Sequence, residues 1–282
     1  MRENKKHSFN HLKIHSQYSI CEGAVKIEDL QIFCKENKIK SVGLSDTSNL
    51  CGALEFSENI SKVGTQPIIG TQINFKFEDT IGLLPLIALN ESGYKKIIDL
   101  SSKSYLENEA LLDPHLNISE LYENKDGVLV LSGTNQGFFG KLFDKGRFNE
   151  ITKIYEKLSS TFVDRFYLEI QRHGDKNEMS FEKYNLKQSS KLQIPIIATH
   201  EVFYLNQEMH EAHDALTCIG SKTYVSEKNR IKYSDQHYFK SDEEMSKLFF
   251  DLPEALENNY NLPFRCNFKP KFSKPVLPNI SS

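Results

Sequence analysis

Short apolar segments alternate with amphipathic segments along most of this 282-residue chain. The apolar segments are short enough for buried strands and lie at residues 10–14, 41–45, 67–75, 83–89, 127–131, 166–170 and 194–198. Between them, apolar residues that recur every three or four positions predict helices at 26–37, 49–63, 91–106, 147–161 and 178–192. Because buried strands and helices alternate, the pattern predicts an α/β fold with a mainly parallel sheet that closes into a barrel or a barrel-like shape.

The C-terminal part follows a different pattern. The sequence from Ser241 to Glu244 is a capping box, so a helix should start there and run to Phe249 or Phe250, and Pro253 predicts the start of a second helix. Residues 267–282 are rich in proline and have little periodicity. We therefore expect one domain over residues 1–266, with a helical C-terminal extension, and the start of a connector at 267–282.

Charge and cysteine content narrow the class of protein. The net charge is −3, so the chain has no overall basic field and does not have the composition of a stand-alone DNA-binding protein. Five scattered cysteines without a C-x-x-C pair fit a reducing compartment and give no support for a zinc ribbon. The polar first seven residues lack the apolar core of a signal peptide, and no apolar run reaches membrane-spanning length. We expect a cytoplasmic protein with no membrane partner.

Side chains with metal-binding chemistry occur near the ends of the predicted strands. His11, Lys13 and His15 alternate along the first strand and therefore share one face, where the ammonium of Lys13 repels a divalent cation. Histidines and acids at later strand ends would suit a cluster of divalent metal ions that catalyses hydrolysis. These residues are Glu22, Asp46, Glu169, His173, His200 and Glu201. Hydrogen-bonded structural histidines would account for the same spacing.

Five separate segments carry a resemblance to a known family: Phe9–Gly23, Ser45–Gly52, Asn90–Tyr94, Leu168–Ile170 and Tyr238–Glu244. Together they resemble the PHP (polymerase and histidinol phosphatase) domain of the alpha subunit of bacterial DNA polymerase III, a replicative family C polymerase, in its proteobacterial form. The resemblance implies a distorted seven-stranded β/α barrel, which agrees with the alternation of strands and helices. It also implies that the chain is a fragment, and that the polymerase core lies beyond residue 282.

The resemblance further implies nine metal-ligand positions on one rim of the barrel. Four of them keep a residue that can bind a metal: His15, Glu22, His173 and Glu201. Five carry a substitution: Lys13, Thr47, Gln72, Leu83 and Phe203. Since Leu and Phe cannot coordinate a metal and Lys13 adds a positive charge, we expect a disabled hydrolytic site with no bound metal. No cofactor is expected in the fragment, and the parent polymerase would use Mg²⁺.

Structural interpretations of the same residues are also available. Glu22 or Glu201 would form an ion pair with Lys13 or Arg172 that replaces the lost cation, and Asp46 would cap or precede the 49–63 helix. His200 adjoins the rim and could substitute for a missing imidazole. The remaining candidates fit a packed helix or a core, although a shared ligand or a partner groove is an alternative: His210, His213, Phe138, Phe139, Phe249 and Phe250.

Two classes of function compete. In the first, the domain is a monomeric binding and scaffolding module that braces the polymerase core, docks the proofreading exonuclease subunit during DNA replication, and meets DNA only through the parent enzyme. In the second, it is an active metal-dependent phosphoesterase or 3′–5′ exonuclease. A purely structural role without a partner is a third possibility. The five substituted ligand positions favour the first class, and polymerisation needs carboxylates that these residues do not supply.

Overall fold

The computed structural model describes residues 8–108 and 112–273. The polar stretch 1–7 and the end of the expected connector, 274–282, lie outside the described residues. Within the described ranges, no helix combines the length and the apolar character that a bilayer crossing requires.

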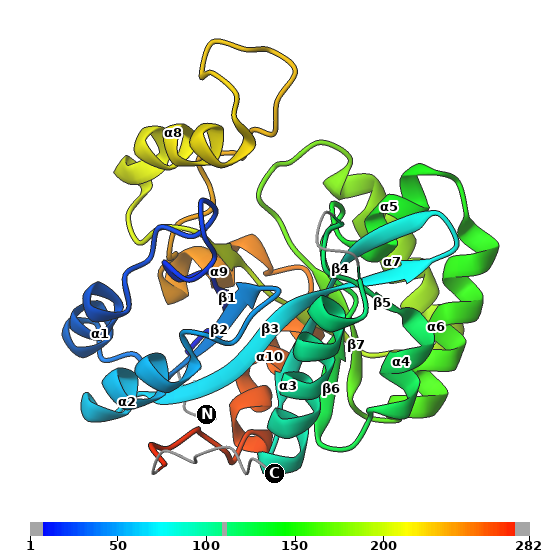
Figure 1. The fold of residues 1–282 in the computed structure, drawn as a ribbon, viewed down its shortest axis with the longest axis horizontal. Coiled ribbons are helices and arrows are strands. Elements are labelled where there is room, and N and C mark those ends of the chain that lie inside the picture. The colour runs from blue at the N-terminus through cyan, green and yellow to red at the C-terminus, as the bar shows by residue number, and fades with distance from the viewer. Residues whose placement is uncertain (1–7, 109–111, 274–282) are drawn as a thin grey trace, which may run out of the picture.

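One curled sheet forms the centre of the domain (Figure 1). Its strands are β1 His11–Ile14, β2 Ser41–Thr47, β3 Gln66–Phe77, β4 Thr80–Ala88, β5 Leu116–Asn117, β6 Val128–Leu131, β7 Phe166–Ile170, β8 Ile196–Ala198 and β9 Glu201–Val202. The order across the sheet is β8-β7-β6-β4-β3-β2-β1-β9, and β5 pairs with β3 beside this path. The β4 strand runs antiparallel to β3 and β6, whereas the other strand pairs are parallel.

The two edges of the sheet meet on one stretch of chain. The β8 and β9 strands follow each other directly in sequence; β8 pairs with β7 and β9 pairs with β1. Residues 196–202 therefore bridge the two edges and, counted as one strand, complete a ring of seven with β1, β2, β3, β4, β6 and β7. The predicted α/β class and its barrel-like closure are confirmed.

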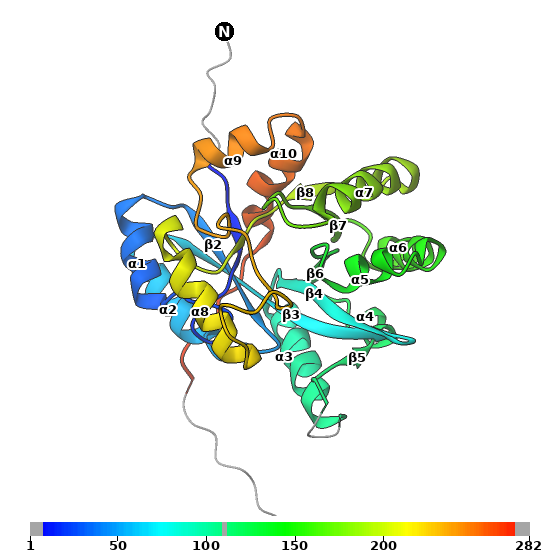
Figure 2. The same cartoon turned by 90° about the horizontal axis from the view of Figure 1, so that it is seen from above.

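Helices surround the strands, as the view from above shows (Figure 2). The helices are α1 Ile27–Glu36, α2 Ala53–Lys62, α3 Glu91–Leu106, α4 Ile118–Glu123, α5 Phe138–Asp144, α6 Phe148–Phe162, α7 Glu178–Leu192, α8 His210–Ser221, α9 Asp242–Leu248 and α10 Pro253–Asn261, with short 3-10 turns at Gln207–Met209 and Leu262–Arg265. Each long helix buries one stripe: α6, for example, turns Ile151, Tyr155 and Leu158 into the core. Burial of these stripes against the sheet holds the ring of helices in place.

The predicted strands and helices are present, with ends that differ by a few residues. The α2 helix starts later than predicted because Ser48 adopts a left-handed conformation and the Asn49 side chain accepts a hydrogen bond from the backbone N–H of Cys51. The sequence pattern did not indicate α4, α5, β5 or β9, which are short. The capping box at Ser241 is confirmed. Phe249 is buried as expected, but Phe250 is exposed, so its assignment to the core is wrong.

Hydrogen bonds join the two ends of the described chain at the barrel's base. The Asn259 side chain on α10 accepts from the backbone N–H of Asn10 at 2.8 Å and donates to the carbonyl oxygen of Asn10 at 2.9 Å. Further along, the backbone N–H of Asn267 donates to the carbonyl of Leu89 at 2.9 Å. The start of the expected connector therefore contacts the barrel.

Candidate functional site

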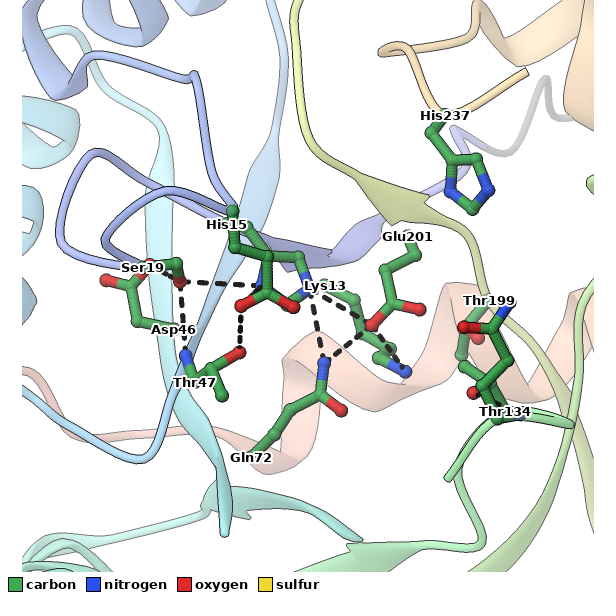
Figure 3. A network of polar contacts seen from close by, with 12 residues as sticks. Lys13, His15, Ser19, Asp46, Thr47, Gln72, Thr134, Thr199, Glu201 and His237 are labelled. Carbon is green, nitrogen blue, oxygen red and sulfur yellow. Dashed lines mark hydrogen bonds and ion pairs between the residues drawn. The ribbon is translucent and has the colours of Figure 1, made fainter. Parts of the chain in front are cut away.

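A small pocket lined by both polar and apolar side chains opens at the end of the barrel where β1, β2, β7 and β9 finish. Its volume is about 100 Å³, and its wall includes Glu22, Gln72, Leu83, Asp175, Glu201 and Phe203. The sequence predicted the candidate chemistry at this rim. Figure 3 shows the polar network beside the pocket, with Lys13 among the carboxylate and amide groups.

Lys13 lies beside Glu201 because the parallel register of β1 and β9 makes these two residues partners. Its buried Nζ lies 3.2 Å from an oxygen of Glu169 and 3.2 Å from an oxygen of Glu201. Neither contact has the angles of a directed hydrogen bond, so the attraction is mainly coulombic. Burial by itself would lower the pKa of Lys13, but the two carboxylates outweigh burial and the pKa is raised. A positive charge is therefore held inside the rim.

Glu201 also contacts the other side of this network. Nε2 of His15 lies 3.0 Å from Oε1 of Glu201, and the Gln72 amide donates to the same oxygen at 2.6 Å. Burial would raise the pKa of Glu201, but the charge of Lys13 and the bond from His15 hold it well below its usual range. Burial likewise opposes protonation of His15, yet the contact with Glu201 raises its pKa. The ionised carboxylate of Glu201 thus lies between the ammonium of Lys13 and the imidazole of His15.

Glu169 is the second partner of Lys13, and neighbouring side chains hold it in place. The Gln171 amide donates to Oε1 of Glu169 at 2.8 Å, and the hydroxyl of Thr199 donates to the same oxygen. The backbone N–H of Glu169 donates to the Ser132 hydroxyl at 2.9 Å. These contacts hold the carboxylate beside Lys13.

Three of the four ion pairs that the sequence allowed are wrong: Glu22 does not pair with Lys13, and Arg172 pairs with neither Glu22 nor Glu201. Glu22 accepts a hydrogen bond from the Thr47 hydroxyl and lies 4.0 Å from Nδ1 of His15, so it does not pair with Lys13. Arg172 pairs with Glu182 on α7 and with Asp251 before α10, at 2.6 and 2.7 Å, because its side chain leaves the barrel toward these helices. The sequence suggested that an ion pair replaces the lost metal cation. The structure confirms one such pair, between Lys13 and Glu201.

Asp46 supports the loop after β1. Its buried carboxylate accepts hydrogen bonds from the backbone N–H and the hydroxyl of Ser16, both at 2.7 Å, and from the Ser19 hydroxyl at 2.8 Å. Asp46 has a structural role, as expected. It does not cap the following helix, because α2 begins after Gly52 without a side-chain cap. The loop that carries His15 and Glu22 is therefore held by this acid.

His173 uses both of its ring nitrogens within the protein. Nδ1 lies 3.2 Å from the Glu178 carboxylate, and Nε2 accepts a hydrogen bond from the backbone N–H of Glu201 at 3.2 Å. This pattern fits a neutral imidazole with its proton on Nδ1. His173 is thus engaged as a hydrogen-bonded histidine, and it does not reach the cluster formed by Lys13 and His15.

Two imidazoles, those of His200 and His237, stack on the ring of His173. The ring centroids of His173 and His200 are 4.4 Å apart, and those of His173 and His237 are 4.0 Å apart with an interplanar angle of 4°. His200 is fully buried, and its Nε2 bonds to the carbonyl of Tyr238 at 3.0 Å, so it does not replace a missing ligand. Burial lowers the pKa of His237 to about 4 and that of His200 well below its usual value. Burial therefore favours the neutral form of His200 and His237.

One group of side chains has the composition of a metal site. Potential ligand atoms of His173, Asp175 and His237 all lie within 4.8 Å of one another. A metal ion must lie near the plane of each bound imidazole, about 2.1 Å from its nitrogen. The rings of His173 and His237 are nearly parallel with centroids 4.0 Å apart, so one ion cannot lie in both planes. The residues in this arrangement do not fit a divalent metal, and neither does the rim that contains Lys13.

Apolar side chains occupy two of the substituted ligand positions. Leu83 lies in the pocket wall, and the Phe203 ring is 4.5 Å from the ring of His15 and 5.3 Å from that of His213. His213 bonds to the carbonyl of Glu22 at 2.7 Å, whereas His210 reaches the carbonyl of Tyr233 at 3.3 Å. His210 and His213 therefore contact separate backbone groups on a packed helix and do not face a common ligand.

Part of the site was not predicted from the sequence. Glu169 was expected at a strand end, but not as the second partner of Lys13, and neither Asp175 nor His237 was predicted. The alternation of β7 could have indicated Glu169, because this residue and Gln171 share a face. No signal pointed to Asp175 or His237, because both lie in loops that only the fold brings together.

A match to a family model agrees with this architecture. Residues 11–173, more than half of the chain, match the PHP domain model. The chain belongs to the PHP domain family.

Curated relatives refine the comparison. The chain is 35% identical to the DNA polymerase III subunit alpha of Caulobacter vibrioides over 96% of its length, and 36% identical to that of Rickettsia felis over 97%. It spans only 24% and 23% of these relatives. A solved structure assigned as a metal-dependent phosphoesterase from Bifidobacterium adolescentis is 11% identical, with a TM-score of 0.45 over 68% of this chain and 87% of that chain. A likeness that distant carries no argument about function.

Proposed function

We propose that this chain is the PHP domain of a replicative DNA polymerase III alpha subunit, and that it acts as a binding and scaffolding module. Relatives named as this subunit, each about four times longer than the chain, support the proposal. The domain braces the remainder of the alpha subunit and docks the proofreading exonuclease subunit during DNA replication. It is monomeric and cytoplasmic, it meets DNA through the parent enzyme, and the parent polymerase uses Mg²⁺ elsewhere.

The metal site of the domain is degenerate in this proposal. The observation that carries this part is the position of Lys13, whose Nζ lies 3.2 Å from both Glu169 and Glu201. The ammonium of Lys13 neutralises part of the charge of the two buried carboxylates. A bound metal ion would have the same effect. A divalent ion that entered would meet this fixed positive charge and would find apolar groups at Leu83 and Phe203.

The alternative is an active metal-dependent phosphoesterase or 3′–5′ exonuclease. The group of His173, Asp175 and His237 is the observation that would favour it. The parallel stacking of its two imidazoles argues against it. Hydrolysis would require these rings to separate before a metal could bind.

Metal titration combined with a nuclease assay tests the degenerate site. Millimolar Mn²⁺ or Zn²⁺ should raise the melting temperature little and should cause no hydrolysis of single-stranded DNA or p-nitrophenyl phosphate. An ion present at a hundred times its Kd would stabilise the native state by about 2.7 kcal/mol. A shift of that size that disappears in a variant with His15→Ala and His173→Ala would overturn the proposal of a degenerate site.

Docking is tested separately by titrating the purified exonuclease subunit of the same organism into the 282-residue chain. Calorimetry should show one binding event, and sedimentation should show a complex of one copy of each. If the two proteins sediment independently at micromolar concentration, the docking part of the proposal is wrong, whatever the metal experiment shows.

A further inference from the structure

Exposed apolar side chains gather on the segment that ends α8 and follows it. Sixteen large apolar residues are exposed in the described part of the chain, and four of them fall within residues 219–231. More than half of the surface of each is exposed; these residues are Ile219, Tyr224, Val225 and Ile231. Figure 1 shows that α8 and the segment after it project from the body of the domain. We refer to residues 219–231 as the α8 surface.

An ion pair holds this irregular segment in place. Both terminal nitrogens of Arg230 contact the Asp214 carboxylate on α8, at 2.6 and 2.7 Å, and the guanidinium also donates to the carbonyl of Val225 at 3.1 Å. The side chain of Arg230 is almost completely buried by these contacts. A bidentate ion pair of this kind fixes the orientation of the two side chains and also balances their charges. The apolar side chains therefore project from an ordered platform, which lowers the entropy cost of binding.

The end of α8 touches the loop after β1. A Cβ placed on Gly220 would lie 2.5 Å from Cβ of Cys21, so α8 and this loop touch at a point where only glycine fits. Ile20 and Ile219 each precede one of these two residues, and both are largely exposed. Ile20 and Ile219 are thus each one residue from this point of contact.

The charge of the segment is opposite to that of the whole chain. The α8 surface contains Lys222 and Lys228 against one acid, Glu227, while Arg230 is neutralised by Asp214. Two positive charges and one negative charge leave an excess of one positive charge, and Lys232 follows directly, although the chain as a whole carries −3. A clustered apolar patch with a basic border is complementary to an apolar segment flanked by acidic side chains.

We propose that the α8 surface is where the exonuclease subunit docks, through an apolar segment flanked by acidic side chains; the identity of this partner rests on the function proposed above. The chemistry favours a protein segment over single-stranded DNA. Sites for single strands stack bases on several aromatic rings, whereas three of the four exposed residues here are aliphatic. Ile219, Val225 and Ile231 suit an apolar segment, and the lysines orient it.

Binding of the exonuclease subunit to three variants tests this surface. A variant with Ile219→Ser and Ile231→Ser should bind at least about tenfold more weakly, because truncating central apolar contacts removes most of the affinity of an interface. Lys228→Glu should bind about threefold more weakly at low salt and almost normally at 0.5 M salt, because exposed charges are screened. A control with Ile32→Ser and Lys40→Glu changes exposed residues on and after α1 and should bind like wild type.

The outcomes separate the surface from the proposed function. Equal binding of wild type and both α8-surface variants, with unchanged circular dichroism melts, overturns the surface while the docking function stands. If wild type does not bind the exonuclease subunit, the docking function is wrong. The assignment of this subunit as the partner of the α8 surface is then wrong too. A 20-nucleotide oligo-dT probe that binds wild type more tightly than the exonuclease subunit does, and loses affinity in Lys228→Glu, overturns the choice of a protein partner.

Discussion

Two sides of the same rim bury polar groups in opposite ways. On the β1 side, the cluster of Lys13, Glu201 and His15 buries charges and balances them against one another. On the β7 side, the rings of His200 and His237 stack on that of His173, and the three imidazoles contact backbone groups and acids. The two sides lie next to each other, and the backbone N–H of Glu201 connects them through its bond to Nε2 of His173.

The difference shows that burial alone does not decide the charge of a histidine. His15 and His237 are both buried, yet the pKa of His15 is raised and that of His237 is lowered to about 4. His15 faces the ionised carboxylate of Glu201, whereas burial beside another imidazole outweighs the single contact of His237 with Asp175. The two sides should therefore respond to pH with opposite signs.

The largest expected effect comes from Lys13→Met. Removal of one partner from a buried ion pair leaves an uncompensated charge, and the cost is about 3–5 kcal/mol of unfolding free energy. Denaturant unfolding at pH 7 measures it. The deficit should shrink as the pH falls, because without Lys13 the carboxylate of Glu201 loses the charge that lowers its pKa and is protonated more readily. This recovery would separate an electrostatic cause from lost packing.

Two further variants sharpen that result. Lys95→Met removes a lysine that pairs with Glu91 at the surface, and it should cost less than about 1 kcal/mol. Lys13→His restores one ligand of the family and should make the melting temperature more responsive to Zn²⁺ than in wild type. If Lys13→Met is neutral and Lys13→His responds to Zn²⁺ no more than wild type, the idea that Lys13 replaces a cation fails.

The next largest expected effect is the loss of stability at acidic pH that His237 causes. His237 has a pKa of about 4 in the folded protein against 6.5 in the unfolded chain, so the unfolded state binds more protons between these values. Its contribution is complete above pH 6.5 and is lost as the pH falls toward 4, and it amounts to about 2–4 kcal/mol. In His237→Asn, unfolding free energy should depend less on pH over this range. If unfolding free energy depended on pH equally in wild type and in His237→Asn, the assignment of a neutral His237 would be contradicted.

The smallest expected effect comes from His15, whose contribution to stability falls as the pH rises. Because the pKa of His15 is raised in the folded protein, its contribution is complete below pH 6.5 and is lost as the pH rises through the folded pKa. His15→Gln keeps a donor toward Glu201 but cannot be charged. Wild type should lose on the order of 1 kcal/mol more than this variant between pH 6 and 9, the size of a net hydrogen bond. A wild type that gains stability over this range relative to His15→Gln would contradict the ion-paired side.

Much of the fold could be predicted because its elements are locally encoded. The α3 and α7 helices have the predicted bounds, since each combines helical periodicity with clear ends. Short elements such as α5 were missed because seven residues rich in buried Phe and Leu show no periodicity. The antiparallel β4 was not predicted either, since the two-residue turn at Glu78 and Asp79 decides its direction and the apolar pattern is the same for both directions.

For the candidate site, the sequence determined which chemistry was available, and the tertiary structure decided how it is used. A lysine in an alternating strand with two histidines placed a positive charge on the same face, and this follows from the two-residue period of a strand. Which acids neutralise that charge depended on the register of β1 with β9 and on the position of β7, and these are separated from Lys13 by more than 150 residues of chain. Periodicity is a local property, whereas coulombic partners are chosen by proximity in space.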